Sequence, residues 1–176
     1  MVSGNRRLLV APDHAGSRLV SGLRPDLRAR QVDCTMKQYF LNEGTIKVPE
    51  SWPDQTVNIF PEPAGDVPQC SLVISRGDVS NGEDLNSYVS RQLDLLEKTL
   101  PGMELIRVDD AILDGERARD AEYTWIADEK KFRQRQVSVR WNQQVLVLTG
   151  TVLEDLYIEQ AMLLQEMIFS FKFRPE

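Results

Sequence analysis

The side chains that most often carry enzymatic chemistry are scarce in this chain. Its single histidine, His14, stands near the N-terminus, and its two cysteines, Cys34 and Cys70, lie far apart. The patterned part of the chain therefore has no Ser–His or Cys–His nucleophile and no metal site built on imidazole. Glycine-rich phosphate-binding patterns and the GxSxG nucleophile pattern are also missing. The sequence predicts a protein that is not an enzyme and that holds no metal or cofactor.

Acidic side chains occur in three adjacent pairs, and each pair has a structural explanation. Neighbouring residues on a strand point to opposite faces, so Asp109 and Asp110 would not share a site. Asp128 and Glu129 lie in an expected turn, and residues 154–155 lie at an expected helix start, where negative charge complements the helix dipole. We expect no catalytic carboxylate pair.

A basic cluster follows the second acidic pair. It consists of Lys130, Lys131, Arg133 and Arg135, with Phe132 between them. Such a cluster could bind phosphate groups, but the chain has a net charge of −6, whereas nucleic-acid binding needs a basic field. We interpret the cluster as a solvated strand end and expect no nucleic-acid partner.

Residues 1–35 differ in character from the rest of the chain. They carry a net charge of +3 against −9 for the remainder, and they show no lasting helical or strand period. The apolar run Leu8–Ala11 is too short for the core of a signal peptide, and the residues before Cys34 do not suit a lipoprotein site. We expect residues 1–35 to be a disordered or spurious extension, and residues 36–176 to form one domain in the cytoplasm.

Hydrophobic periodicity after residue 35 predicts strands, a helix, more strands and a second helix. The first helix is expected to start at a capping box made by Ser80 and Glu83 and to end before Pro101. Because strands do not alternate with helices, the fold class is α+β with an antiparallel sheet. Two amphipathic helices are expected to pack on one face and to leave the other to solvent, a second subunit or a ligand. The expected strands are 39–41, 45–48, 56–60, 67–76, 104–108, 117–126, 132–141 and 145–152, and the expected helices are 85–100 and 156–171.

Five short segments of this domain follow one another in a characteristic order. They are Tyr39–Gly44 (YFLNEG), Val48–Ile59 (VPESWPDQTVNI), Ser71–Arg76 (SLVISR), Tyr88–Leu93 (YVSRQL) and Arg133–Gln136 (RQRQ). In this order they resemble the DcrB-like family and, within it, the Eag (effector-associated gene) chaperones of type VI secretion. The turn Asn42–Gly44 and the stretch Trp52–Asn58 are the most specific pieces. The likeness spans essentially all of residues 36–176.

The resemblance implies a curved, DcrB/PsbP-like antiparallel sheet with helices on its convex side. It also implies a homodimeric cytoplasmic chaperone that does not itself insert into membranes. Its client would be the N-terminal transmembrane region of a toxin with a PAAR spike domain, sheltered until that toxin is loaded under VgrG and exported. The alternative within the same family is an envelope or accessory binding module without a chaperone role.

By position, the resemblance assigns client binding to Val57, Ile59, Leu72, Ile74 and Gln136. Val57 and Ile59 have the same strand parity, as do Leu72 and Ile74, so each pair shares a face. We expect all five on the uncovered face of the sheet, with the Gln136 amide bonding to exposed backbone or hydroxyl groups of a helix. The same periodicity also fits a core in which the four apolar side chains face the protein's own helices, and only the resemblance favours the groove.

Overall fold

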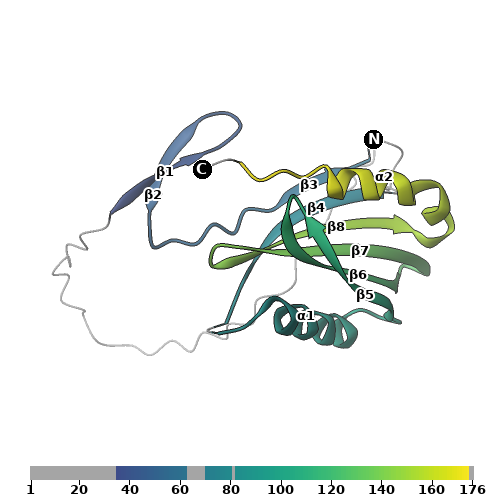
Figure 1. The fold of residues 1–176 in the computed structure, drawn as a ribbon. Coiled ribbons are helices and arrows are strands. Elements are labelled where there is room, and N and C mark those ends of the chain that lie inside the picture. The colour runs from purple at the N-terminus through teal and green to yellow at the C-terminus, as the bar shows by residue number, and fades with distance from the viewer. Residues whose placement is uncertain (1–34, 63–69, 81, 175–176) are drawn as a thin grey trace, which may run out of the picture. The chain divides into compact units, whose positions relative to one another are not determined.

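The computed structural model describes residues 35–62, 70–80 and 82–174 (Figure 1). The chain divides into two compact units, residues 1–51 and residues 52–176. The expectation that residues 1–35 are a disordered or spurious extension lies outside the described residues, apart from Thr35.

The first unit contains the predicted β-hairpin. β1 (Met36–Phe40) pairs antiparallel with β2 (Thr45–Pro49), and the amide of Leu41 donates to the carbonyl of Gly44 at 2.7 Å to close the turn. A lone two-stranded hairpin buries little apolar surface, and Phe40 is 66% exposed. All buried residues of the described chain therefore belong to the second unit.

The second unit is built on one six-stranded sheet with the order β3-β4-β8-β7-β6-β5. Every neighbouring pair in it is antiparallel, so the predicted α+β class with an antiparallel sheet is confirmed. A turn at Asp114 and Gly115 joins β5 to β6, with both residues at positive φ. The strands are β3 (Asn58–Pro61), β4 (Cys70–Asp78), β5 (Glu104–Leu113), β6 (Glu116–Ala127), β7 (Lys130–Trp141) and β8 (Gln144–Leu153).

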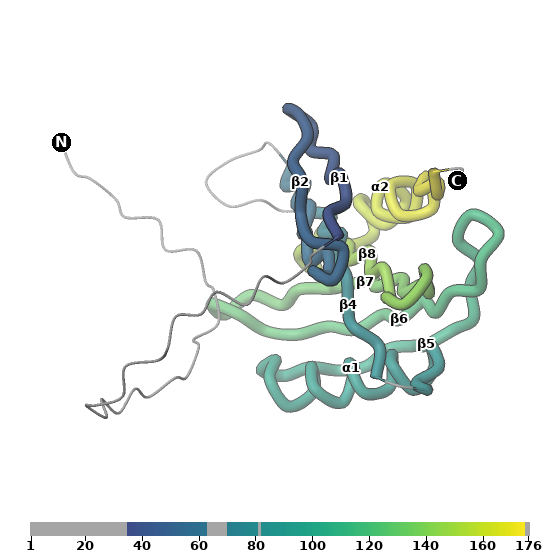
Figure 2. The backbone as a smooth tube through the Cα atoms, turned by 90° about the vertical axis from the view of Figure 1, so that its left-hand side faces the viewer, coloured from purple at the N-terminus to yellow at the C-terminus, as the bar shows by residue number. Residues whose placement is uncertain are grey.

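The two helices lie on opposite faces of this sheet, so the prediction that both pack on one face is wrong (Figure 2). α1 (Leu85–Thr99) packs on Val147 of β8, whereas α2 (Tyr157–Phe169) packs on its neighbour Leu148. The unbroken apolar run Val145–Leu148 explains the difference, because such a run is typical of a strand buried on both faces. We call the two sides the α1 face and the α2 face.

Two glycines allow the helices to approach the sheet closely. A Cβ on Gly77 of β4 would lie 1.9 Å from the hydroxyl of Tyr88 in α1. A Cβ on Gly150 of β8 would lie 2.8 Å from a methyl carbon of Leu164 in α2. Both distances are too short for real atoms, so a side chain at either position would push a helix outward.

α1 starts at an N-cap aspartate rather than at the predicted capping box. The carboxylate of Asp84 accepts a hydrogen bond from the amide of Ser87 at 2.7 Å. Ser80 and Glu83 do bond to each other, but they form the turn that precedes the helix. Hydrogen bonds from Arg91 and from the Ser80 amide lower the pKa of Glu83 to about 2.

Candidate binding surface

α1 covers only one end of its own sheet face. Along β8, Val147 is buried beneath the helix, whereas Thr149, two residues further on, is only partly buried. Along β7 the same change separates buried Ser138 from partly buried Gln136. We call the uncovered region the open face. It is formed by Ile59, Ser71, Val73, Gln134, Gln136, Thr149 and Thr151.

A single row of paired residues crosses the open face from one strand to the next. Ile59 of β3 lies opposite Val73 of β4, Val73 lies opposite Thr149 of β8, and Thr149 lies opposite Gln136 of β7. At about 4.8 Å between strands, the row spans ~14 Å. Its outer half is apolar and its inner half is polar, so the open face has two chemically distinct sides.

The polar side contains both a satisfied amide and an available amide. Gln134 Nε2 donates to Thr151 Oγ1 at 2.8 Å in the neighbouring row. The amide of Gln136 makes no side-chain hydrogen bond to any residue that the structure describes. A partly buried amide keeps donors and acceptors that a bound chain can use. Gln136 is therefore the side chain of this row best placed to bond to a ligand.

The five residues assigned to client binding do not share a face. Ile59 and Gln136 lie on the open face, and Val57, which directly precedes β3, is 50% exposed. Leu72 and Ile74 point to the α2 face, where Leu72 is 7% exposed and belongs to the hydrophobic core. Their placement on the open face is thus contradicted, and the core interpretation is correct for these two residues.

The sequence interpretation missed Ser71, Val73, Thr149 and Thr151 of the open face, and Val73 is the apolar one among them. Val73 and Leu72 are adjacent on β4 and therefore point to opposite faces of the sheet. To assign binding to one of these residues is to assign it to one face. The pairing of Ile59 with Val73 puts Val73 on the open face, because directly paired residues project to the same side of a sheet. Strand register was the missing signal, and a single strand pattern does not contain it.

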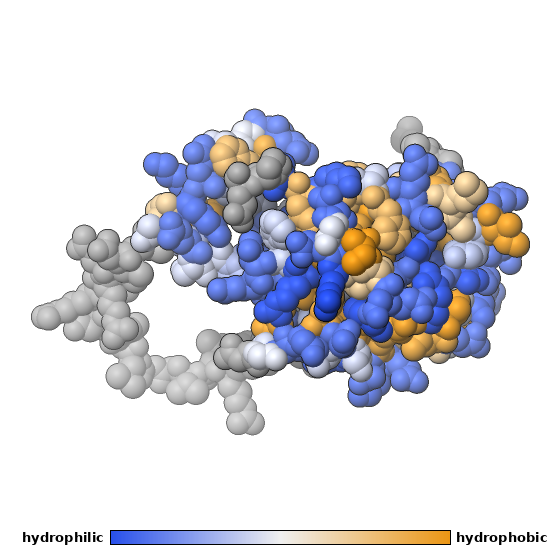
Figure 3. Space-filling model, in the orientation of Figure 1, coloured by the Kyte–Doolittle hydropathy of each residue, from blue (hydrophilic) through white to orange (hydrophobic). Residues whose placement is uncertain are grey.

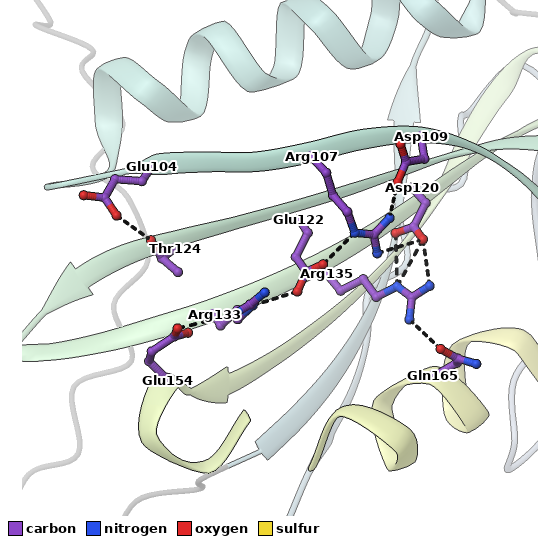
Figure 4. A network of polar contacts seen from close by, with 10 residues as sticks. All are labelled: Glu104, Arg107, Asp109, Asp120, Glu122, Thr124, Arg133, Arg135, Glu154 and Gln165. Carbon is purple, nitrogen blue, oxygen red and sulfur yellow. Dashed lines mark hydrogen bonds and ion pairs between the residues drawn. The ribbon is translucent and has the colours of Figure 1, made fainter. Parts of the chain in front are cut away.

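The other side of β5, β6 and β7 carries an ion-pair network beside α2 (Figure 4). Asp120 and Glu122 are only 4% and 3% exposed, and three arginines cover them. Arg107 Nε and Arg133 Nε each lie 2.7 Å from an oxygen of Glu122, and Arg135 Nη2 lies 2.7 Å from Asp120 Oδ2. Buried carboxylates need such partners, so this half of the α2 face has a structural role.

The network also holds α2 against the sheet. Arg135 Nη1 donates to Gln165 Oε1 at 3.1 Å, and the Arg133 guanidinium lies 3.8 Å above the ring centre of Tyr157. Burial opposes the charge of Glu122, but hydrogen bonds from Tyr157 and two arginines outweigh it and lower the pKa of this carboxyl. Arg133 and Arg135 have side chains only 21% and 14% exposed, so interpreting them as a solvated strand end is wrong.

Exposed apolar side chains also occur away from the open face. Figure 3 shows hydrophobic residues among hydrophilic ones on the side of the molecule drawn in Figure 1. Ile158 and Met162 of α2, for example, are 90% and 84% exposed. Exposure alone therefore does not identify a binding surface. The open face is distinguished by its ordered, strand-to-strand change from apolar to polar side chains.

Two further kinds of feature matter in the described part of the chain: clusters of metal ligands and helices able to span a membrane. Among the described residues, no three His, Cys, Asp or Glu side chains gather closely enough to hold a metal ion. None of the helices in the described ranges has the length and hydropathy needed to cross a bilayer. The fold is an α+β domain in which α1 leaves part of one face of an antiparallel sheet uncovered.

Sequence comparison places this domain in a family. The chain belongs to the DcrB family, whose sequence profile matches residues 43–170. A relative named Effector EagT6, from Pseudomonas aeruginosa strain PAO1, is 38% identical over 118 residues. This match covers 66% of the present chain and 81% of the relative.

The chain is also similar to a solved structure. The crystal structure of PA94 from Pseudomonas aeruginosa, described as a protein of unknown function, matches with a TM-score of 0.70 and 30% sequence identity. The match covers 80% of the present chain and 99% of PA94. A looser likeness, with a TM-score of 0.44 and 12% identity, relates 88% of the chain to 95% of cyanobacterial PsbP from Synechocystis.

Proposed function

We propose that this protein is a chaperone of type VI secretion that binds transmembrane helices of an effector on its open face. Membership of the DcrB family and the 38% identity to Effector EagT6 support a role in type VI secretion. The observation that carries the binding proposal is the row from Ile59 through Val73 and Thr149 to Gln136. It combines an apolar wall with hydrogen-bonding groups on one uncovered sheet surface.

The dimensions of the row suit a single helix. An α-helix with its side chains is about 10–12 Å across, and the row spans ~14 Å. A transmembrane helix in water exposes about 20 apolar residues, so its segment needs a substitute for lipid before delivery. Ile59 and Val73 would cover the bulky apolar side of such a helix. Thr149 and Gln136 would meet a side where small residues expose hydroxyl or backbone groups.

The family resemblance suggests the setting in which this binding would occur. The client would be the N-terminal membrane-spanning region of an effector with a PAAR domain, held in the cytoplasm before that effector joins the VgrG spike. The chaperone would act as a homodimer, would not itself enter the membrane, and would catalyse no reaction. The competing function is a DcrB-like envelope or accessory module, which requires export; cell fractionation that found the protein only outside the cytoplasm would favour it.

The decisive experiment compares two neighbouring residues of β3. Ile59 is 61% exposed on the open face, and Phe60 is 55% exposed on the α2 face. The Ile59→Asp and Phe60→Asp variants therefore introduce the same charge at matched exposure on opposite sides. Each would be co-expressed with a candidate effector that carries a PAAR domain and hydrophobic N-terminal segments.

We expect Ile59→Asp to lower the amount of soluble effector strongly, because a carboxylate on the apolar wall would oppose a bound apolar helix. Phe60→Asp should leave the amount of effector near that of the wild type. Circular dichroism and the thermal unfolding midpoint of each purified chaperone would establish that the variants are folded. Equal effector levels with both folded variants would rule out the open face as the client site.

A further inference from the structure

The segment that leads into β3 is held in place by an arginine of the neighbouring strand. Arg76 Nη1 donates to the carbonyl oxygen of Thr56 at 2.7 Å, and Arg76 Nε lies 3.4 Å from Asp54 Oδ2. Asp54 Oδ1 in turn accepts from the amide of Thr56 at 2.9 Å. Gln144 of β8 donates from its side chain to the carbonyl of Asp54 at 3.2 Å. Residues 54–56 are thus tied to both β4 and β8.

The Arg76 side chain replaces a backbone hydrogen bond that is missing between the segment before β3 and β4. β3 pairs with β4 so that Asn58 lies opposite Ile74, and an extension of this register would place Thr56 opposite Arg76. The ladder ends at Asn58, and the Arg76 guanidinium bonds to the Thr56 carbonyl instead. By bonding to this carbonyl, the Arg76 side chain fixes the chain two residues before β3 begins.

β3 depends on this support because it is short and lies at the edge of the sheet. It has four residues, and all of them are exposed. An edge strand has a ladder on one side only, and a short one gains little from burial. Val57 lies between the fixed Thr56 and the first paired residue, Asn58. The segment that carries Val57 and Ile59 is therefore held before Val57 by Arg76 and after it by the pairing with β4.

We propose that Arg76 is a positioning residue for client binding: by holding residues 54–56, it orders β3 and presents Val57 and Ile59 to a bound apolar helix. This inference rests on the proposed chaperone function. It assigns a role in binding to a residue whose side chain contacts the incoming segment rather than the client.

The first test measures order in β3 without any client. Because the Glu62 amide donates to the Cys70 carbonyl at 2.9 Å, alternation along an antiparallel pair predicts that the Asn58 and Phe60 amides also bond to β4. Hydrogen exchange of the full chain should be about ten-fold faster or more at these two amides in Arg76→Ala. Exchange in β8 should not change, and Arg76→Lys should restore part of the protection.

A matched control separates this effect from the loss of an arginine in general. Arg140 Nη1 also donates to a backbone carbonyl, that of Glu83 at 2.8 Å, but outside β3. Arg140→Ala should leave the exchange of Asn58 and Phe60 as in the wild type. Equal exchange at these amides in Arg76→Ala and the wild type would overturn the inference while leaving the proposed function intact.

The second test joins this order to binding. The probe is a fluorescent, lysine-flanked peptide with about 20 residues of leucine, alanine and serine, long enough to span a bilayer as a helix. We expect Arg76→Ala to bind it at least five-fold more weakly than Arg140→Ala at an unchanged thermal unfolding midpoint. Faster exchange with undiminished binding would refute the positioning role. Failure of the wild-type protein to bind the peptide would count against the proposed function itself, and with it against any role of Arg76 in binding.

Discussion

Alanine substitutions of the neighbours Leu72 and Val73 should have different effects, because the two residues lie on opposite faces of β4. Leu72 is 7% exposed in a cluster with fully buried Leu148 and Ile168. Replacing such a leucine with alanine costs about 2–5 kcal/mol of the free energy of unfolding, through lost transfer energy and a residual cavity. Val73 is only partly buried and loses two methyl groups, which corresponds to about 1 kcal/mol.

Urea unfolding of the purified variants measures this contrast. With a dependence of about 2 kcal/mol per molar urea, the middle of the usual range, Leu72→Ala should lower the unfolding midpoint by ~1–2.5 M, whereas Val73→Ala should lower it by a fraction of this. Trp125 and Trp141 lie in the sheet and provide a fluorescence signal. The order of the two variants should reverse in the client assay, where Val73→Ala at near wild-type stability should reduce the amount of soluble effector.

Two results would contradict this assignment of faces. One is a loss of stability in Val73→Ala as large as that in Leu72→Ala, which would place Val73 in the core. The other is a Leu72→Ala protein that unfolds like the wild type but no longer protects the effector. Either result would mean that the two faces of β4 are the reverse of those given by its pairing with β8, in which Leu72 lies opposite Gly150 and Val73 opposite Thr149.

Three further changes test other parts of the structure. Gln136→Leu should reduce soluble effector in co-expression more than Gln134→Leu, because the Gln134 amide already bonds within the protein, and both should unfold near the wild-type temperature. Because the folded pKa of Glu122 is lowered, its charge stabilises the protein above the unfolded pKa of about 4.3. That stability is lost as pH falls through the folded pKa, so Glu122→Gln should unfold earlier at pH 7 and show a weaker dependence on acid in thermal scans. Gly77→Ala should cost about 1–3 kcal/mol by urea unfolding, and Tyr88→Phe in the same chain should recover part of this loss by removing the hydroxyl that the new Cβ would meet.

Patterns within single segments predicted much of this fold. The sequence placed the hairpin, the strands and both helices, because apolar periodicity and turn residues act over a few neighbouring positions. The side of the sheet on which each helix packs was predicted wrongly. That property depends on which strands become neighbours, because only the central place of β8 in the sheet gives both sides of the apolar run Val145–Leu148 a helix to pack on.

The candidate site shows the same limit more sharply. Alternation along the strand correctly put Leu72 and Ile74 on one face and Val73 on the other. Alternation alone does not show which of the two faces is buried. Which face is buried follows from long-range structure, such as the pairing of Ile59 with Val73 and the place of Leu72 in one core cluster with Ile168. The role proposed for Arg76 could not be predicted from the sequence for the same reason. It depends on the strand register that brings Arg76 next to Thr56, just before β3.

The segment Arg133–Gln136 shows how two faces can share one strand. Alternation directs Arg133 and Arg135 to the α2 face, where they neutralise the buried carboxylates of Glu122 and Asp120. The intervening Gln134 and Gln136 point to the open face. An arginine in place of Gln136 would bring a charge against an apolar helix, at a cost in desolvation.

The reverse exchange is equally unfavourable. A glutamine in place of Arg135 would leave the buried Asp120 carboxylate without the cation that lies 2.7 Å away. Each residue type therefore suits one face only. In the repeated Arg–Gln pattern the arginines meet the needs of the α2 face and the glutamines those of the open face, so the pattern is not a single motif. Position along such a segment is not sufficient to assign a binding role, because adjacent residues serve the packing of α2 and the surface proposed for the client.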